Sequence, residues 1–403
     1  MAKLLMISGD RSLAEGRRGA FYNTLEEFRK YWDRIDIICP KAQPSSRAQV
    51  EGNPKSNLRP ELRSRKVQNR QPFSNVFIHP SPWPLMLQPF WILKEGLRIY
   101  KENKFDLTTV HEYPPFYNGI GSYFLWRKIR IPYWIEVHHI VGYPKAADFK
   151  EFFYRWLTRV FIKFDAQKAI AVRIVNKKQV LDFLIRAGVS VNKIIYLPSL
   201  YIDLDIFKPL NLKKEYDAIF VGRLEENKGA DLFIGAMAQL KTSRFYRGSA
   251  TESGQSPELK TLIVGDGPLL TSLKFKVKNL KLENQIIFHG WAEDSSKIAK
   301  LMNKSMVLIM PSYNEGGPRV VLEAMACGVP ILATNVGLIP DLADKGVVKI
   351  IEWDAEDIAQ KTKELLENED ERNRLNRIGI EIAKQFEKKE AIKNYAEKLQ
   401  SLI

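Results

Sequence analysis

The chain has 403 residues, of which 45% are hydrophobic and 27% charged, and its formal net charge at pH 7 is +15. This length exceeds what one ordinary hydrophobic core supports, so two globular domains are expected. The only two cysteines, Cys39 and Cys327, exclude a disulfide framework and fit a reducing cytoplasm. No apolar run has the length of a signal peptide or a spanning helix, which predicts a soluble or peripheral protein.

The positive charge lies almost entirely in the first half of the chain. Residues 1–200 carry 33 Lys and Arg against 17 Asp and Glu, a net +16, whereas the remainder carries 29 against 30, a net −1. Such asymmetry predicts that the first half faces an anionic partner, which could be a membrane surface, a phosphorylated acceptor or nucleic acid. The alternative is a solvated face whose charge serves solubility.

The first residues predict a βαβ unit. Residues 3–8 are an apolar run typical of a buried strand, 20–32 a helix, and 34–39 a second strand. Residues 41–72 are rich in Pro, Ser, Asn and Arg without apolar periodicity, which predicts a long loop. The eight basic residues in this loop favour attachment to anionic lipid, and the alternative is a disordered insertion.

Three further strands are predicted in the first half, at residues 106–111, 132–139 and 169–172. The second of them ends in His138 and His139. An imidazole can donate or accept a hydrogen bond at neutral pH, although a histidine at a strand end, taken alone, is more often structural.

A helix dense in aromatic side chains is predicted at residues 149–164. Within it Arg155, Arg159 and Lys163 recur every four residues and form one basic stripe. A basic, aromatic, amphipathic helix of this kind lies on a membrane surface or packs against the sheet with its stripe solvated. The sequence leaves both interpretations open.

The second domain is predicted to begin near Leu210. Its first strand, 217–221, is followed by Gly222-Arg223 and then by Lys228, which places two cations beyond the end of a strand. A guanidinium forks to phosphate oxygens and an ammonium adds a point charge. The run Asp203-Leu204-Asp205 imitates a metal-binding Asp-x-Asp motif, but it lies in the segment between the domains, so no metal role is assigned to it.

The most informative segment is 310–337. A buried strand is followed by a polar turn that holds Glu315, by the pair Gly316-Gly317, and by Pro318, which suits the first turn of a helix. The helix ends at Gly328, and the next strand follows. This order points backbone N–H groups and a positive helix end at whatever occupies the turn.

Glu323 lies in that helix among apolar residues. A carboxylate in such a place either faces water or needs a hydrogen-bonding partner, because unpaired burial costs several kcal/mol. The hydroxyls of a sugar or a ribose would serve, and on spacing alone the two interpretations are balanced.

This segment resembles the signature of the family 4 retaining glycosyltransferases, nucleotide-sugar enzymes of the GT-B fold. The pattern is Glu, seven residues, Glu, with a glycine pair after the first glutamate and Ala-Met-Ala-x-Gly-x-Pro after the second, and all of it is present. The resemblance implies an α/β protein with two Rossmann-like domains, 1–200 and 201–385, that face each other across a nucleotide-sugar cleft. Residues 386–403 would form a helix that packs back on the first domain.

The resemblance also implies roles for single residues. Glu315 would bind the donor sugar and Glu323 the ribose of the nucleotide. Arg223 and Lys228 would bind the donor diphosphate, and His138 would contact the sugar near the reacting carbon.

Other positions extend the donor site or depart from the family. Gly316, Gly317 and Pro318 belong to the matched turn. Near the amino terminus only Gly19 matches the family's glycine pair beside the phosphates and sugar, because Arg18 replaces its partner. Arg173 stands where the family has a serine.

The implied reaction moves a hexosyl unit from a UDP- or GDP-linked sugar to an acceptor hydroxyl with retention of configuration. Neither a metal nor another cofactor is expected, because the two cations replace the metal. The basic first domain favours a lipid-linked or anionic glycan acceptor of cell-surface polysaccharide or glycolipid synthesis, in the cytoplasm at the inner membrane face. The alternatives are a nucleotide-sugar epimerase on the same fold and a basic nucleic-acid-binding protein, and since RNA-binding motifs are missing, no nucleic-acid partner is expected.

Overall fold

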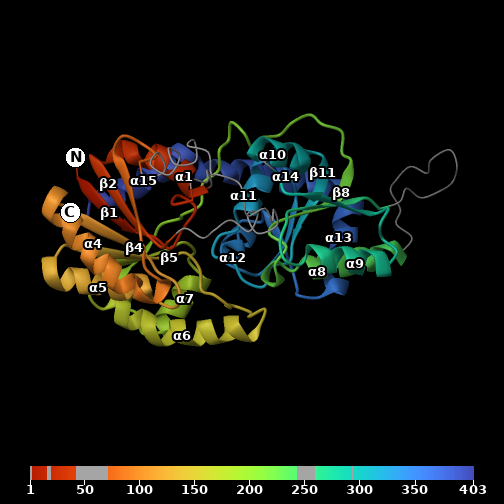
Figure 1. Ribbon diagram of the computed structural model, residues 1–403. Helices are drawn as coiled ribbons and strands as arrows, with labels where there is room; N and C mark the ends of the chain where they lie inside the picture. Colours follow the sequence, from red (N-terminus) through yellow and green to blue (C-terminus); the bar gives the residue numbers. More distant parts are fainter. Residues whose placement is uncertain (1, 16–19, 42–70, 243–258, 293) are drawn as a thin grey trace, which may run out of the picture.

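Two parallel β-sheets with helices on both faces form the computed structural model, which describes residues 2–15, 20–41, 71–242, 259–292 and 294–403 (Figure 1). The first sheet has seven strands in the order β3-β2-β1-β4-β5-β6-β7, and the second has six in the order β10-β9-β8-β11-β12-β13. Both orders are those of doubly wound Rossmann-like sheets. The predicted α/β class with two such sheets is therefore confirmed.

The first sheet lies in the first half of the chain. Its strands are β1 Lys3–Ile7, β2 Arg34–Cys39, β3 Val76–Pro80, β4 Leu107–His111, β5 Tyr133–Val137, β6 Ala171–Ile174 and β7 Ile194–Tyr196. Its helices are α1 Ala20–Phe28, α4 Gln88–Asn103, α5 Tyr117–Ile129, α6 Phe149–Ala166 and α7 Gln179–Arg186. The strands are nearly continuous apolar runs, because a parallel sheet covered by helices is buried on both faces.

The second sheet lies in the second half. Its strands are β8 Tyr216–Val221, β9 Thr261–Val264, β10 Ile286–Gly290, β11 Ser305–Met310, β12 Ile331–Thr334 and β13 Val348–Ile351. The helices are α8 Ala230–Thr242, α9 Leu270–Asn279, α10 Ser295–Asn303, α11 Arg319–Ala326, α12 Ile339–Ala343, α13 Ala355–Glu367 and α14 Glu369–Ala383, and α15 Lys388–Gln400 follows them. No helix in the described ranges is both long and apolar enough to cross a membrane.

The structure differs from the sequence-based expectation at four strands. β3, β7 and β13 were not predicted, and each lies at an edge of its sheet. β6 begins and ends two residues later than expected, so that Arg173 lies inside the strand and is buried. The loop predicted at residues 41–72 is described only at residues 41 and 71–72. Gly19 and residues 243–258 also lie outside the described residues.

Helix α15 lies beside α1 of the first half, although it follows the second half in sequence (Figure 1). Ile392, Ala396 and Leu399 recur at helical spacing and are buried in the core that α1 also covers. The ring of Tyr395 stacks on that of Phe28 at a centroid distance of 4.9 Å. Since full burial of an apolar side chain contributes about 1.5–3 kcal/mol, this helix is a substantial part of the first core.

The carboxyl ends of the two sheets face each other through direct contacts. The side-chain amide of Asn176 donates to the carbonyl oxygen of Gly316 at 3.1 Å, and this hydrogen bond is buried. The Gln179 amide bridges the halves twice, donating to the Asn335 carbonyl and accepting from the Gly337 N–H, both at 2.6 Å. Residues after the strand ends of both sheets are thereby brought together.

Candidate active site

The second sheet reverses its strand order between β8 and β11. At such a switch point the chain connections leave in opposite directions and open a crevice at the carboxyl ends of the strands, where ligands bind in this class of sheet. The loop after β8 supplies Arg223 and Lys228, and the loop after β11 supplies Glu315. These three residues line one cavity of about 200 Å³ together with Gly317 and Pro318.

Lys228 and Glu315, which both line this cavity, form an ion pair with each other. The Lys228 Nζ lies 2.5 Å from the Glu315 Oε1, and the Ser312 hydroxyl donates to the same oxygen at 3.0 Å. The loop that carries Lys228 lies against the chain just after β11 at Gly229, which has φ +67°. A Cβ on Gly229 would lie 2.2 Å from the Pro311 carbonyl oxygen, so a glycine is needed there. A cation and a carboxylate are thus held together, although 87 residues separate them.

Arg223 lies at the rim of the cavity. Its side chain is 64% exposed, and its Nη1 lies 2.9 Å from the Glu225 Oε1. Exposed ion pairs of this kind contribute at most about 1 kcal/mol, so the guanidinium can turn toward an anion at little cost.

The glycine pair after Glu315 lets the two halves meet. A Cβ on Gly316 would lie 1.8 Å from the His138 carbonyl oxygen, and one on Gly317 would lie 2.4 Å from the Leu200 side chain. The predicted turn is therefore in van der Waals contact with the end of β5. Gly316 and His138, predicted for opposite sides of the cleft, lie against each other.

Glu323 is 9% exposed on α11. The sequence left open whether this carboxylate faces water or is buried and needs a partner, and the structure shows that it is buried. Burial raises the pKa of Glu323 to about 7, and the nearby Arg319 cation opposes this shift. Arg319, one helical turn before it, lines the cavity at the switch point, whereas Glu323 does not.

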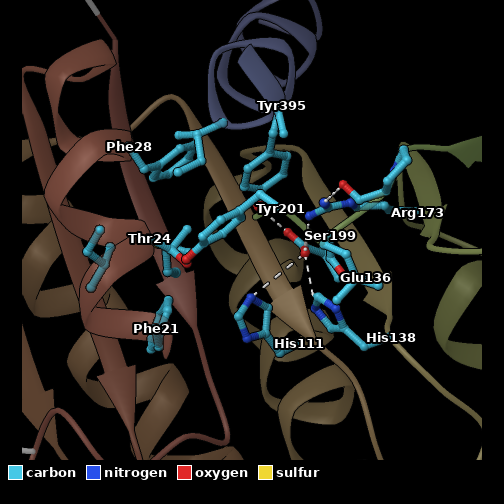
Figure 2. Close-up of a pocket in the computed structure, with 16 residues that line it drawn as sticks. Phe21, Thr24, Phe28, His111, Glu136, His138, Arg173, Ser199, Tyr201 and Tyr395 are labelled. Atoms are coloured by element: carbon cyan, nitrogen blue, oxygen red, sulfur yellow. Dashed lines mark hydrogen bonds and ion pairs between the residues drawn. The ribbon is translucent and has the colours of Figure 1, made fainter. Parts of the chain in front are cut away.

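His138 follows β5 and borders a second cavity of about 110 Å³, shown in Figure 2. This cavity lies between the first sheet, residues 198–201 of the segment that connects the two halves, and α15. Its polar side chains include His111, Glu136, His138 and Arg173, and its aromatic side chains are Phe21, Phe28, Tyr201 and Tyr395.

The sequence-based reasoning missed Glu136 as a member of this site. The side chain is 1% exposed, and its Oε2 lies 3.3 Å from the His138 Nε2 and 2.8 Å from the Arg173 Nη1. One signal was present: a single acidic residue lies inside an apolar strand, and a single basic residue lies inside the next strand along the chain. Such charges are almost never buried unless they are paired.

His111, Glu136 and His138 have the spacing of metal ligands, since one ligand atom of each lies within 4.8 Å of the others. The chemistry of the group does not fit a resident metal. The Arg173 guanidinium already lies 2.8 Å from the carboxylate oxygen that would be a ligand. A fixed positive charge there repels a second cation.

Residues 202–382 match the family model described as Glycosyl transferases group 1. Among curated proteins, N-acetyl-alpha-D-glucosaminyl L-malate synthase of Bacillus anthracis is 29% identical over 187 residues, 46% of this chain. UDP-Gal:alpha-D-GlcNAc-diphosphoundecaprenol alpha-1,3-galactosyltransferase of Escherichia coli is 25% identical over 246 residues, 59% of this chain. In these two matches the chain spans 47% and 60% of the relatives' own lengths.

Solved structures with the same fold cover the whole chain. Sucrose-phosphate synthase from Thermosynechococcus elongatus superposes with a TM-score of 0.74 at 18% identity, covering 100% of this chain and 99% of that one. Anabaena HepE in complex with UDP and glucose superposes with a TM-score of 0.70 at 18% identity, covering 100% of both chains. The fold is GT-B, and within it residues 202–382 match the glycosyl transferases group 1 family model.

Proposed function

We propose that the protein is a retaining glycosyltransferase that moves a hexosyl unit from a UDP- or GDP-linked sugar to an acceptor hydroxyl. The observation that carries this proposal is the meeting of Arg223, Lys228 and Glu315 in one cavity at the switch point of the second sheet. The solved structure of Anabaena HepE with UDP and glucose supports a nucleotide-sugar donor for this fold.

In the proposed reaction the bond between the anomeric carbon and the leaving diphosphate breaks as the acceptor oxygen bonds to that carbon from the same face. The acceptor proton passes to an oxygen of the leaving diphosphate. Arg223 and Lys228 stabilise the negative charge that develops there. Glu315 and His138 hold the sugar, Glu323 accepts hydrogen bonds from the ribose, and no metal takes part.

The donor site is tested by thermal stabilisation with UDP, GDP and ADP. A ligand present at 100 times its dissociation constant adds about 2.7 kcal/mol to the free energy of unfolding. We expect one nucleotide to raise the melting temperature, and Arg223→Ala and Glu323→Ala to remove most of that rise. If no nucleotide stabilises the wild-type protein, the proposed function is wrong.

The outer surface of the first half supports a lipid-linked acceptor at an anionic membrane. Helix α6 exposes an aromatic face that includes Phe149, Phe153 and Trp156, at 82%, 46% and 55% exposure. The aromatic surface extends through Tyr123 of α5, whose ring lies 5.7 Å from that of Phe164. Aromatic side chains beside a basic stripe insert into the headgroup layer of anionic membranes. The Escherichia coli relative is named for an acceptor that is linked to diphosphoundecaprenol.

The membrane surface is tested by sedimentation with phosphatidylglycerol vesicles. We expect the double variant Phe153→Ser/Trp156→Ser to bind at least about tenfold more weakly, because two aromatic side chains no longer insert. The matched control is Phe275→Ser/Trp291→Ser, which removes two aromatics of the second half that are even more exposed, at 65% and 67%. Equal binding of both variants would exclude α6 as the contact surface.

A further inference from the structure

Glu136 occupies the middle of a row of polar side chains that crosses the first sheet. In register, His111 of β4 pairs with Glu136 of β5, and Glu136 pairs with Arg173 of β6. His138 lies two residues beyond Glu136, and residues two apart on a strand point to the same side. The row therefore ends beside the histidine predicted to contact the donor sugar (Figure 2).

Every oxygen of the Glu136 carboxylate has a partner. Oε2 lies 2.8 Å from the Arg173 Nη1, 3.3 Å from the His138 Nε2 and 3.8 Å from the His111 Nε2. Oε1 accepts a hydrogen bond from the Tyr395 hydroxyl of α15, although 259 residues separate the two.

The partners of Glu136 are themselves held in place. Arg173 donates from Nε to the Leu197 carbonyl at 2.9 Å and from Nη2 to the Pro198 carbonyl at 2.8 Å. Its guanidinium lies 4.0 Å from the centroid of the Tyr395 ring. The charge that pairs with Glu136 therefore has a fixed position.

The electrostatics keep Glu136 ionised. Burial alone raises the pKa of Glu136, but Arg173 and the contacts with His138 and His111 outweigh it, so the pKa lies well below the usual range for a carboxyl. Burial lowers the pKa of His111 to about 4, so this ring is neutral and does not compete for the negative charge. His138, whose Nε2 lies 3.3 Å from the carboxylate, is left as the neighbour on which Glu136 acts.

We infer that Glu136 is the positioning residue for His138, and that the Tyr395 hydroxyl of α15 sets how strongly Glu136 acts. The carboxylate holds the Nε2 side of the His138 ring and leaves Nδ1 as its remaining polar atom. In the neutral ring Nε2 carries the proton, so Nδ1 accepts a hydrogen bond from a sugar hydroxyl. This inference rests on the proposed function, in which His138 contacts the sugar.

The test follows the ring nitrogens of His138 by NMR in the full-length protein, with the signal assigned through His138→Gln. We expect the wild-type neutral ring to carry its proton on Nε2 alone. In Glu136→Gln both tautomers should be present, because the carboxylate that accepts from Nε2 is gone. The matched control is Glu95→Gln, which removes a second carboxylate that lies 3.0 Å from a ring nitrogen of His79 and should leave His138 unchanged.

Glu136→Gln leaves Arg173 buried without its charge partner, so a second variant guards against misfolding. Tyr395→Phe keeps the ring on Phe28 and removes only the hydroxyl. We expect the proton of His138 to stay on Nε2 and the Nε2 resonance to shift, because the carboxylate loses a competing donor.

Mixed tautomers in Glu136→Gln and a shifted Nε2 resonance in Tyr395→Phe support positioning, because a merely structural role would not produce them. An unchanged Nε2 resonance of His138 in folded Tyr395→Phe, or a proton that stays on Nε2 alone in Glu136→Gln, would overturn the inference. These NMR signals need no sugar transfer, so a protein that binds no nucleotide would refute the proposed function separately.

Discussion

Replacing Lys228 by methionine should lower the turnover number of sugar transfer by about a thousandfold. The ammonium group lies 2.5 Å from the Glu315 carboxylate in a cavity where both side chains are less than one-fifth exposed. A charge fixed there is worth most when negative charge develops on the leaving diphosphate. Methionine keeps the length of the side chain and removes only its charge. The turnover number is measured by single-turnover transfer at saturating donor.

The fold should survive this substitution, because the Ser312 hydroxyl still donates to Glu315. The matched control is Lys304→Met, which removes the lysine of another ion pair, 2.9 Å from Glu215 and remote from the cavity. This control should transfer sugar at the wild-type rate. A turnover number for Lys228→Met within tenfold of the wild-type value would remove Lys228 from the catalytic group.

Gly316→Ala should abolish most of the activity, by about a hundredfold or more, without abolishing nucleotide binding. The added Cβ would lie 1.8 Å from the carbonyl oxygen of His138. The Cβ would clash with a backbone carbonyl, so no side chain can move aside to relieve the contact. The two halves then cannot close to the distance at which His138 reaches the sugar. Transfer rate and UDP affinity, measured on the same preparation, separate closure from binding.

The control for this substitution is Gly379→Ala in α14. A Cβ at Gly379 would meet its nearest neighbour, Met325, at 3.6 Å, which is ordinary van der Waals contact. The control should therefore keep full activity. If Gly316→Ala also transferred sugar normally, the close approach of the two halves would have no part in the reaction.

The sequence predicted the site best where one short segment contains all of its parts. The strand, glycine turn and helix around Glu315 are local, and their order follows from apolar runs, two glycines and one proline. The three unpredicted strands, β3, β7 and β13, lie at sheet edges, where each pairs with a single neighbouring strand. Their existence depends on a neighbour that is not local in sequence.

The row through Glu136 could not be predicted, because its members come from β4, β5, β6 and α15. Arg173 was noted only as a departure from the family's serine. Its partner Glu136 lies 37 residues away, and Tyr395 lies 259 residues from Glu136. A charge inside an apolar strand signals that a partner exists, but only the sheet register and the return of α15 identify it.

The return of α15 has a consequence for how the protein is made. A ribosome delivers the strands of the first sheet long before Ile392, Ala396 and Leu399, which complete the core beside α1. Until then the nascent first half exposes an apolar groove and holds Glu136 without its tyrosine. Domains generally fold in the order of synthesis, and exposed apolar surface invites aggregation, so this half must wait while the second one forms. The first half of the chain, although translated first, is the last to mature.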